Sequence, residues 1–339
     1  MNQRIVNLPS SMQEIHITTP GAPEVLQLRE VAMPQVANHE VLLRVHAAGV
    51  NRPDVVQRLG QYPMPPGANP TPGLEVAGEV VALGSAVHHF SLGDTVCGLS
   101  NGGGYAEYCV LPAGQCLPIP QGVSMLQAAA IPETFFTVWA NLFQIGAGSK
   151  GQRVLIHGGT SGIGSTALML CQAFGLQAFA TVGDAQKCDV VRQLGGVPIN
   201  YREEDFATQV LAATGGQGVD IILDIIGAAY LEQNIKALAH GGRLVIIGMM
   251  GGAVADKLSL LPILMKKAQI TGSLMRPRSA EEKAVIAQAL QQKVWPLLAA
   301  GQCLPIIDSV FPLAQAAQAH HRMQGNHVGK IVLQVIEDD

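Results

Sequence analysis

The sequence predicts an α/β fold in which a mostly β region precedes a doubly wound parallel sheet. This prediction rests on a change of hydrophobic pattern near residue 150. Before that point, short apolar runs such as 41–45 and 79–83 alternate with glycine turns, for example at Gly93 and across 102–104. After it, apolar strands alternate with helical stretches up to about residue 265. Such alternation is typical of βαβ units, whose parallel sheet is covered on both faces.

The second region supplies most of the regular elements. We expect strands at 154–156, 178–182, 221–223 and 244–247, and helices at 163–174, 184–194 and 228–239. Gly175 and Gly195 follow two of these helices, in the position where a left-handed glycine commonly ends a helix. Further along, Ser279 and Glu282 form the capping-box pattern that opens a helix. Residues 330–335 read as a closing apolar strand.

Composition limits the class of protein. Of the 339 residues, 48% are hydrophobic and 14% are charged, which excludes a disordered chain. The chain carries 21 basic and 25 acidic side chains without a basic block, so we expect no nucleic-acid partner.

The cysteines and the amino-terminal residues indicate the cellular compartment of the protein. The six cysteines are scattered without the spacing of a zinc site, which suits a reducing environment. The first residues lack the pattern of a signal peptide, and no apolar run reaches the ~18 residues of a membrane span. We therefore expect a cytoplasmic protein with no membrane partner.

A glycine-rich loop follows the first strand of the alternating region. Residues 157–164 read HGGTSGIG and lead directly into a predicted helix. Glycines at this position let the chain turn sharply and let backbone N–H groups approach a pyrophosphate, whose negative charge the helix N-terminus favours. A plain tight turn between strand and helix is the alternative interpretation. The strand before the loop and the helix after it favour a dinucleotide-binding (Rossmann) site.

The choice between NAD and NADP depends on the end of the next strand. An acidic residue about 20 residues beyond the loop takes the ribose 2′-OH in NAD sites. Asp184 lies near that distance, but it follows Gly183, where it can equally act as a helix N-cap. Lys187 lies one helical turn later and can meet a 2′-phosphate, or it is an ordinary surface lysine. We expect NADPH as the cofactor.

These residues belong to a longer series of segments that the chain shares with a known family. The segments are Asn51–Asp54, Gly60–Tyr62, Pro72–Gly78, Gly158–Gly164, Ile199–Tyr201, Gly248–Gly252, Leu274–Arg276 and Gly329–Leu333. In them the chain resembles the zinc-independent quinone oxidoreductase (zeta-crystallin-like) branch of the medium-chain dehydrogenase/reductase superfamily, most of all its stress-inducible members. The segments follow in family order from about residue 12 to the end, which makes the set more specific than any one of them.

The resemblance implies three domain segments. A GroES-like catalytic β domain spans residues 1–130, and a Rossmann dinucleotide-binding domain spans 131–265. The C-terminal segment, 266–339, then returns to the catalytic domain.

The resemblance also implies the cofactor contacts. For the pyrophosphate they are Thr160, Ser161, Gly162, Ile163 and Gly164; for the adenosine phosphate Gly183, Lys187 and Tyr201, beside Asp184; for the nicotinamide Thr137, Ile247, Gly248, Met249, Met250, Leu274, Met275 and Arg276; and for a C-terminal contact Asn326 and Lys330. Asp184 departs from the small hydroxyl residue that the family often carries there. Core packing is the alternative interpretation of the three methionines.

Two positions argue against a catalytic zinc ion. Zinc-dependent members of the superfamily carry a cysteine where this chain has Asn51 and a histidine where it has Leu74, and amide and leucine side chains do not replace thiolate and imidazole. No four-cysteine lobe follows Gly93. Without a metal to polarise an alcohol, reduction of an electron-poor acceptor is favoured over alcohol oxidation.

Such a reduction needs a positioned acceptor and a hydrogen bond to the oxygen that gains charge. Asn51 and Tyr62 are the candidate catalytic residues, although Tyr62 can also be a lid aromatic without a chemical role. Glu75 reads as a hydrogen-bonding group at a domain boundary rather than as a base. The histidine pairs at 88–89 and 320–321 read as surface pairs.

Three functions remain open from the sequence. The first is NADPH-dependent reduction of quinones, and the second is reduction of the double bond of enones or enals in the same fold. The third is an NADPH-binding protein with little turnover. The expected small-molecule partner is thus a quinone or an enone. We also expect exposed apolar strands near 244–247 and 269–273 that can extend a sheet across a homodimer.

Overall fold

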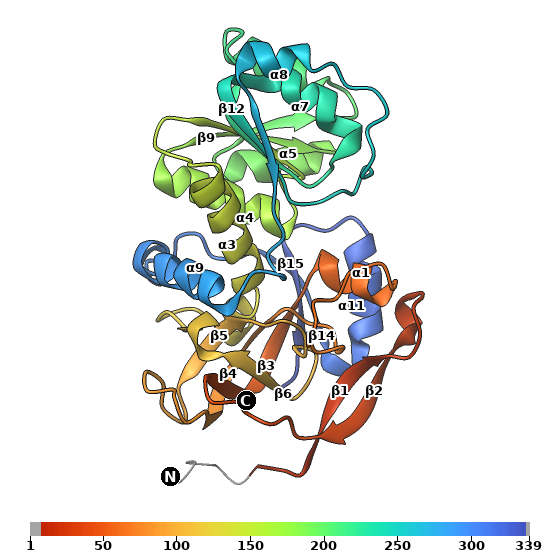
Figure 1. Cartoon of the computed structure of the whole chain (residues 1–339), viewed down its shortest axis with the longest axis vertical. Helices are drawn as coiled ribbons and strands as arrows, with labels where there is room; N and C mark the ends of the chain where they lie inside the picture. The colour runs from red at the N-terminus through yellow and green to blue at the C-terminus, as the bar shows by residue number, and fades with distance from the viewer. Residues whose placement is uncertain (1–7, 337–339) are drawn as a thin grey trace. The chain divides into compact units, whose positions relative to one another are not determined.

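The computed structural model describes residues 8–336 and divides the chain into two compact units. The first unit comprises Met1–Phe136 and Arg276–Asp339, and the second comprises Thr137–Met275. Figure 1 shows the chain leaving the first unit at yellow, passing through the green elements of the second, and returning to the first at blue.

The first unit is built on antiparallel strands. Its strands are β1 (Ser11–Ile17), β2 (Leu26–Ala32), β3 (Glu40–Val50), β4 (Glu75–Leu83), β5 (Thr95–Leu99), β6 (Tyr108–Pro112), β7 (Cys116–Pro118), β14 (Ile307–Pro312) and β15 (Lys330–Gln334). Strands β1 and β2 pair with each other, and the others form a seven-stranded sheet in the order β14-β15-β3-β4-β5-β7, with β6 paired to β3. All pairs are antiparallel except β14 with β15.

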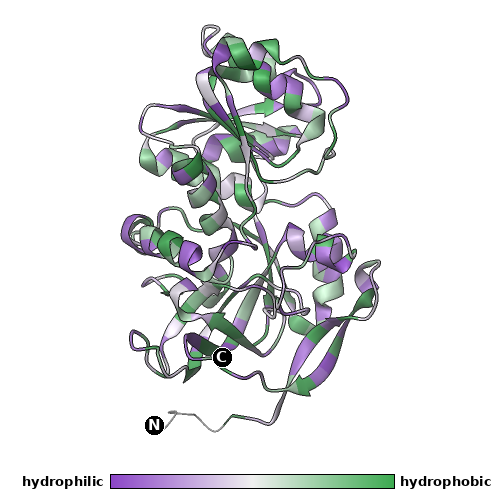
Figure 2. Ribbon diagram, viewed as in Figure 1, coloured by the Kyte–Doolittle hydropathy of each residue, from purple (hydrophilic) through white to green (hydrophobic). Residues whose placement is uncertain are grey.

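The helices of the first unit lie in the connections between these strands and after the second unit. They are α1 (Arg52–Arg58), α2 (Met125–Ala128), α9 (Ala280–Lys293), α10 (Trp295–Ala299) and α11 (Ala316–Gln324), and α3 (Pro132–Val138) contains the boundary with the second unit. Apolar side chains of the sheet form one core with those of α11, including Val45, Val76 and Ala319. Figure 2 shows long hydrophobic stretches in these strands.

The second unit is a six-stranded sheet in which every pair is parallel. Its strands are β8 (Arg153–His157), β9 (Gln177–Val182), β10 (Val197–Asn200), β11 (Val219–Asp224), β12 (Leu238–Ile246) and β13 (Gln269–Gly272). The spatial order β10-β9-β8-β11-β12-β13 is 3-2-1-4-5-6 along this unit, which is the doubly wound dinucleotide-binding order. The strand order reverses between β8 and β11, so the loop after β8 lies at the switch point where such sheets bind ligands.

The helices of the second unit are α4 (Gly162–Phe174), α5 (Ala185–Gln193), α6 (Phe206–Ala213), α7 (Leu231–Ala237) and α8 (Leu261–Lys266), with a π-helix at Trp139–Ile145. Helix α4 ends as predicted, because Gly175 takes a left-handed conformation with φ of 72°. The helix expected at 228–239 is shorter, since β12 already begins at Leu238. Leu244 and Val245 are fully buried between β11 and β13, so the expectation of an exposed strand there was wrong.

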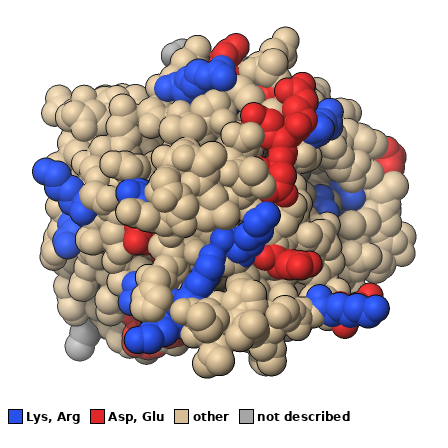
Figure 3. Space-filling view, turned by 90° about the horizontal axis from the view of Figure 1, so that it is seen from above, with Lys and Arg blue, Asp and Glu red and all other residues tan. Residues whose placement is uncertain are grey.

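The described surface carries both signs of charge. On the face shown in Figure 3, Lys and Arg side chains lie among Asp and Glu side chains rather than in a field of one sign. Among residues 8–336, no helix is long and apolar enough to cross a membrane.

Candidate active site

The glycine loop lies at the carboxyl end of β8. Ser161 caps α4: its hydroxyl accepts the N–H of Gly164 at 3.0 Å and donates to the carbonyl oxygen of Gly158 at 2.8 Å. The amides of Gly162 and Ile163, the first two residues of the helix, have no acceptor within a helix and are available to an anion. A Cβ atom on Gly164 would lie 2.1 Å from the oxygen of Gly158, so only glycine permits this turn. The loop therefore fits a phosphate group.

A buried chain of hydrogen bonds begins at His157, directly before this loop. The Nε2–H of His157 donates to Asn234 at 2.7 Å, and its Nδ1 accepts from the Thr181 hydroxyl at 3.0 Å. The amide of Asn234 donates to Asp224 at 3.1 Å, and Asp224 in turn accepts the N–H of Ile226 at 2.6 Å. Burial lowers the pKa of His157 to about 4, so the ring stays neutral. This chain of hydrogen bonds links the ends of β8, β9 and β11, and no local sequence pattern predicts it.

The expected adenosine-phosphate residues gather after β9 and β10. Asp184 caps α5, where its Oδ1 accepts the N–H of Lys187 at 2.9 Å. Tyr201 is 44% exposed, and a Cβ atom on Gly183 would lie only 2.8 Å from its phenolic oxygen. The Tyr201 phenol therefore packs directly over the Gly183 backbone. The N-cap role that the sequence allowed for Asp184 is the one it has in the structure.

The residues expected near the nicotinamide include a buried hydroxyl without a partner. Thr137 is 8% exposed, and its Oγ1 has no hydrogen-bond partner among the described residues. Its carbonyl oxygen accepts from Asn141 at 2.8 Å, at the start of the π-helix. Such an orphaned group is costly unless a ligand satisfies it, and π-helical turns are frequent at functional sites. The amide of a nicotinamide is a ligand of suitable chemistry.

The loop after β12 is exposed. Met249 and Met250 are each 60% exposed and Leu274 is 53% exposed, so core packing does not explain the first two. The N–H of Ile247 donates to the carbonyl oxygen of Asp224 at 2.8 Å. This loop is thereby attached to the same aspartate that ends the chain from His157.

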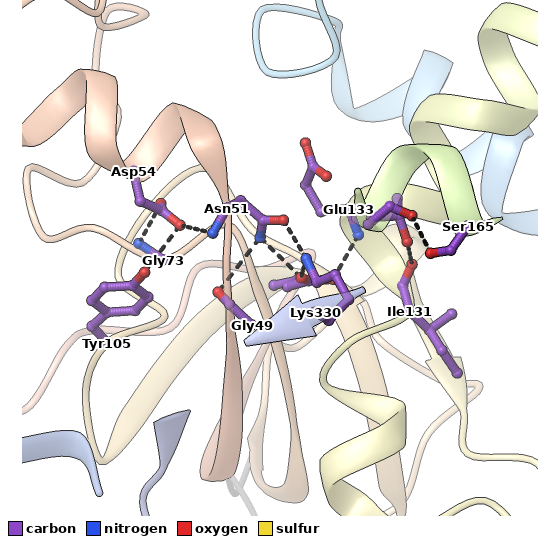
Figure 4. A network of polar contacts seen from close by, with 12 residues as sticks. Gly49, Asn51, Asp54, Gly73, Tyr105, Ile131, Glu133, Ser165 and Lys330 are labelled. Atoms are coloured by element: carbon purple, nitrogen blue, oxygen red, sulfur yellow. Dashed lines mark hydrogen bonds and ion pairs between the residues drawn. The ribbon is translucent and has the colours of Figure 1, made fainter. Parts of the chain in front are cut away.

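In the first unit, Asn51 is part of a buried ion-pair network (Figure 4). Lys330 on β15 forms an ion pair with Glu75 on β4 at 2.6 Å, and the two side chains are 4% and 0% exposed. Asn51 bridges them: its amide nitrogen donates to Glu75 at 2.9 Å, and its oxygen accepts from Lys330. The N–H of Glu133 donates to the other oxygen of Glu75 at 2.8 Å. Both ends of the Asn51 side chain are therefore engaged within the protein.

A second buried chain begins at the same turn. Asp54 accepts the N–H of Asn51 at 2.9 Å and the hydroxyl of Tyr105 at 3.1 Å, and burial raises the pKa of its carboxyl group to about 6. The Tyr105 oxygen accepts from Nε2 of His320, whose Nδ1 accepts from Arg58, both at 3.2 Å. The expectation that His320 lies on the surface was wrong, since it is 0% exposed. Burial and the Arg58 charge lower its pKa to about 3.

Tyr62 lies against a guanidinium group. The centre of the Arg276 guanidinium is 5.0 Å from the Tyr62 ring centroid. Arg276 donates to the side chain of Gln57 at 2.8 Å and to the carbonyl oxygen of Asn101 at 2.9 Å. Burial raises the pKa of Tyr62, and the Arg276 charge opposes this rise. Tyr62 is therefore a neutral phenol at physiological pH, and it can donate a hydrogen bond.

Lys283 and Asn326 are two further polar groups of the first unit. Lys283 is fully buried on α9 and donates to Asn101 at 2.6 Å and to the Arg276 carbonyl at 2.9 Å. Asn326 is exposed on the loop before β15. Lys330, in contrast, is buried in the network with Asn51.

Glu133 is a group that the sequence analysis missed. It is the second residue of α3 and is only 9% exposed. Burial raises the pKa of its carboxyl group to about 7, the Glu75 and Asp54 charges add to the rise, and the Lys330 charge opposes it. The sequence signal was weak: Pro132-Glu133 reads as an ordinary helix start, in which an acidic first turn is common.

Comparison with known proteins agrees with this architecture. Residues 37–121 match the "Alcohol dehydrogenase GroES-like domain" family, and residues 162–291 match the "Zinc-binding dehydrogenase" family. The quinone oxidoreductase of Sus scrofa is 33% identical over 95% of this chain and 97% of its own.

Two solved structures extend the comparison. A mycobacterial protein complexed with NADPH is 28% identical with a TM-score of 0.84, covering 96% of this chain and 100% of that one. The CurK enoyl reductase is 25% identical with a TM-score of 0.82, covering 96% of this chain and 99% of that one.

The fold is thus a GroES-like domain joined to a Rossmann domain, and the protein is an oxidoreductase. It belongs to the medium-chain dehydrogenase/reductase superfamily, in the branch of the quinone oxidoreductases. The predicted fold class and family are confirmed.

The chain's residues do not fit a zinc ion at the position that the superfamily uses. Asn51 has its amide engaged with Glu75 and Lys330, and Leu74 is a 4% exposed alkyl side chain without a donor atom. Within residues 8–336, no group of three or more His, Cys, Asp or Glu side chains is arranged to hold a metal ion.

We predict that Lys330→Met destabilises the protein by about 3–5 kcal/mol, because it leaves the Glu75 carboxylate buried without its cation. The free energy of unfolding in urea measures the effect. The double variant Lys330→Met/Glu75→Gln is the control, and it should recover part of the loss because no buried charge remains uncompensated. A single variant as stable as the wild type would show that the pair is not structural.

Proposed function

We propose that the protein is an NADPH-dependent quinone reductase that works by hydride transfer without a metal ion. The observation that carries this proposal is the pair of residues at the zinc positions. Asn51 is hydrogen bonded at both ends and Leu74 has no donor atom, whereas the dinucleotide loop is complete. Without a Lewis acid to activate an alcohol, an already electron-poor acceptor is the suitable substrate. Similarity to quinone oxidoreductases supports this class.

The residues of the second unit have the chemistry to hold the dinucleotide. The backbone amides of Gly162 and Ile163 suit the pyrophosphate, and the orphaned hydroxyl of Thr137 suits the nicotinamide amide. Exposed side chains at Met249, Met250 and Leu274 suit its ring. When bound, NADPH supplies the hydride.

We assign the hydrogen bond to the acceptor oxygen to a residue of the first unit. Tyr62 can donate a hydrogen bond to the oxygen that becomes negative, and the Arg276 charge beside its ring favours this polarity. Asn51 is better suited to positioning than to contact with the acceptor, because it holds Lys330 against Glu75.

Reduction of enones or enals is the second candidate. The likeness to the CurK enoyl reductase favours it, and the chemistry of hydride addition is similar. NADPH consumption with 1,4-benzoquinone and with hex-2-enal decides between the two. We expect faster consumption with the quinone, and unchanged activity after dialysis against a chelator. Activity that depends on a tightly bound zinc ion would contradict the proposal.

We predict that Tyr62→Phe lowers turnover with quinones by roughly threefold to thirtyfold and leaves NADPH affinity unchanged. The phenylalanine ring still packs beside Arg276, so only the hydroxyl is removed. Steady-state rates and NADPH fluorescence titrations of both proteins measure the two effects. Equal turnover would restrict Tyr62 to a packing role.

We predict that Lys187→Ala weakens NADPH binding about tenfold and leaves NADH binding unchanged. A charge-assisted contact to phosphate contributes about 1.5–3 kcal/mol, and 1.4 kcal/mol corresponds to a factor of ten. Because Asp184 caps α5 through Oδ1, it is less available as the acid that selects NAD. Lys236→Ala, which removes an exposed lysine of α7, is the control. Equal loss of both cofactors, or a wild type that prefers NADH, would contradict this assignment.

We propose that the protein is a cytoplasmic homodimer. All six cysteines are free thiols, as suits a reducing compartment. Strand β13 is the last strand of its sheet. Helix α8 and its N-cap residue expose large apolar side chains: Leu260 at 69%, Leu261 at 62%, Leu264 at 74% and Met265 at 69%. An exposed edge beside such a patch is suited to pairing with a second copy.

We predict that Leu264→Glu shifts the protein from dimer to monomer in sedimentation velocity, because it introduces a charge into the exposed apolar patch on α8. Val285→Glu, an exposed apolar position on α9, is the control and should leave the dimer intact. A wild type that sediments as a monomer would contradict the dimer itself.

A further inference from the structure

Asn141 is a buried amide side chain whose two polar ends bind two different segments of the second unit. It lies on the π-helix at Trp139–Ile145 and is 1% exposed. Its nitrogen donates to the carbonyl oxygen of Thr137 at 2.8 Å, and its oxygen accepts the hydroxyl of Ser273 at 2.7 Å. Asn141 and Ser273 are 132 positions apart in the sequence. One side chain therefore fixes the distance between two segments that the local sequence does not connect.

Ser273 connects Asn141 to the carboxyl end of the parallel sheet. Ser273 directly follows β13, and its N–H donates at 3.1 Å to the carbonyl oxygen of Ile246, the last residue of β12. The π-helix that carries Asn141 also packs against β11 and β12. Doubly wound sheets bind their ligands at the edge that the carboxyl ends of the strands form. Asn141 thus ties Thr137 to the ligand-binding edge of this sheet.

The Thr137 hydroxyl is the polar group that this network leaves open. It is buried and has no hydrogen-bond partner within residues 8–336, whereas the carbonyl oxygen of the same residue is held by Asn141. A ligand that supplies the missing hydrogen bond recovers the free energy that an unpaired buried hydroxyl costs. A hydroxyl both donates and accepts, and a carboxamide such as that of nicotinamide offers a group for either role.

The same network continues into exposed apolar side chains. Ile246 precedes the loop that carries Met249 and Met250, which are each 60% exposed, and Ser273 precedes Leu274, which is 53% exposed. Exposed apolar side chains beside an open hydroxyl suit a flat ring that bears an amide. The hydrogen bonds of Asn141 and Ser273 therefore set the hydroxyl and these apolar groups relative to one another.

We propose that Asn141 is a positioning residue for the nicotinamide of NADPH, an inference that rests on the proposed function. Both polar ends of Asn141 are engaged within the protein, so it acts through Thr137 and Ser273. It holds the Thr137 hydroxyl, which binds the carboxamide, at a fixed distance from the segment after Ser273, which lies against the ring. Because hydride transfer depends steeply on the orientation of the donor, loss of this link lowers the transfer rate.

The test compares the wild type with four variants. Asn141→Leu removes both hydrogen bonds, Ser273→Ala removes one of them, and Thr137→Val removes the open hydroxyl. Thr214→Val is the control, because it removes a buried hydroxyl at the end of α6 that binds only its own segment. Stopped-flow oxidation of bound NADPH by 1,4-benzoquinone measures the transfer rate. We expect a loss of about tenfold or more in Asn141→Leu, a smaller loss in Ser273→Ala, and the wild-type rate in Thr214→Val.

A second readout needs no turnover. Adenosine 2′,5′-bisphosphate carries the adenosine and the 2′-phosphate of the cofactor without the nicotinamide, and NADP⁺ carries both. In calorimetric titrations, Asn141→Leu and Thr137→Val should bind the bisphosphate as the wild type does and should bind NADP⁺ several-fold more weakly. A general loss of structure would instead weaken both ligands, so the ratio of the two affinities reports the nicotinamide site alone.

The double variant Asn141→Leu/Thr137→Val tests the route of the effect. If Asn141 acts through Thr137, the double variant loses less than the product of the two single losses, because the second change removes an interaction that is already misplaced.

A wild-type transfer rate in Asn141→Leu would overturn the proposal, as would an equal loss of affinity for both ligands. Ser273→Ala removes the same link at its other end, so a wild-type rate there has the same consequence if Asn141→Leu does not fold. A wild type that binds NADP⁺ but reduces neither acceptor would overturn the proposed function instead, while the titrations still decide the role of Asn141.

Discussion

The buried ion pair between Lys330 and Glu75 is the constraint on which the first unit depends. Taking both charges out of water is costly, and the cost is offset only if each remaining donor and acceptor finds a partner. Asn51 and the N–H of Glu133 supply those partners. The pair therefore fixes the start of α1 and the start of α3 against β4 and β15. The network, rather than the conformation of a single loop, therefore fixes the positions of Asn51 and of the Glu133 backbone.

The network also explains why asparagine suits position 51, where zinc-dependent relatives have a metal ligand. A cysteine at position 51 would be a metal ligand, whereas asparagine carries a donor and an acceptor on one planar group. This group matches a carboxylate on one side and an ammonium on the other. The substitution thus changes the position from holding a metal ion to holding a lysine. Burial raises the pKa of the Glu133 carboxyl group, and the Glu75 and Asp54 charges add to this rise against the opposing charge of Lys330.

Local sequence patterns predicted the features that depend only on neighbouring residues. The glycine loop and the end of α4 at Gly175 depend on neighbouring residues, and the structure has both of them. The apolar strands followed from their short hydrophobic runs, but a run does not tell an inner strand from an edge. Leu244 was therefore misplaced on the surface, while β13 is the edge strand of its sheet. The capping role of Asp184 was foreseen only as one of two alternatives.

The side-chain networks of the candidate site depend on contacts between segments that are far apart in the sequence. Lys330 and Asn51 are 279 positions apart, and Arg58 and His320 are 262 apart, so no periodicity or spacing predicts that they meet. His320 looked like half of a surface pair because its neighbour His321 is indeed exposed. Glu133 looked like an ordinary acidic residue in a first helical turn. Burial in the fold raises the pKa of its carboxyl group, and charges on other elements modify that rise, so the local sequence does not reveal it.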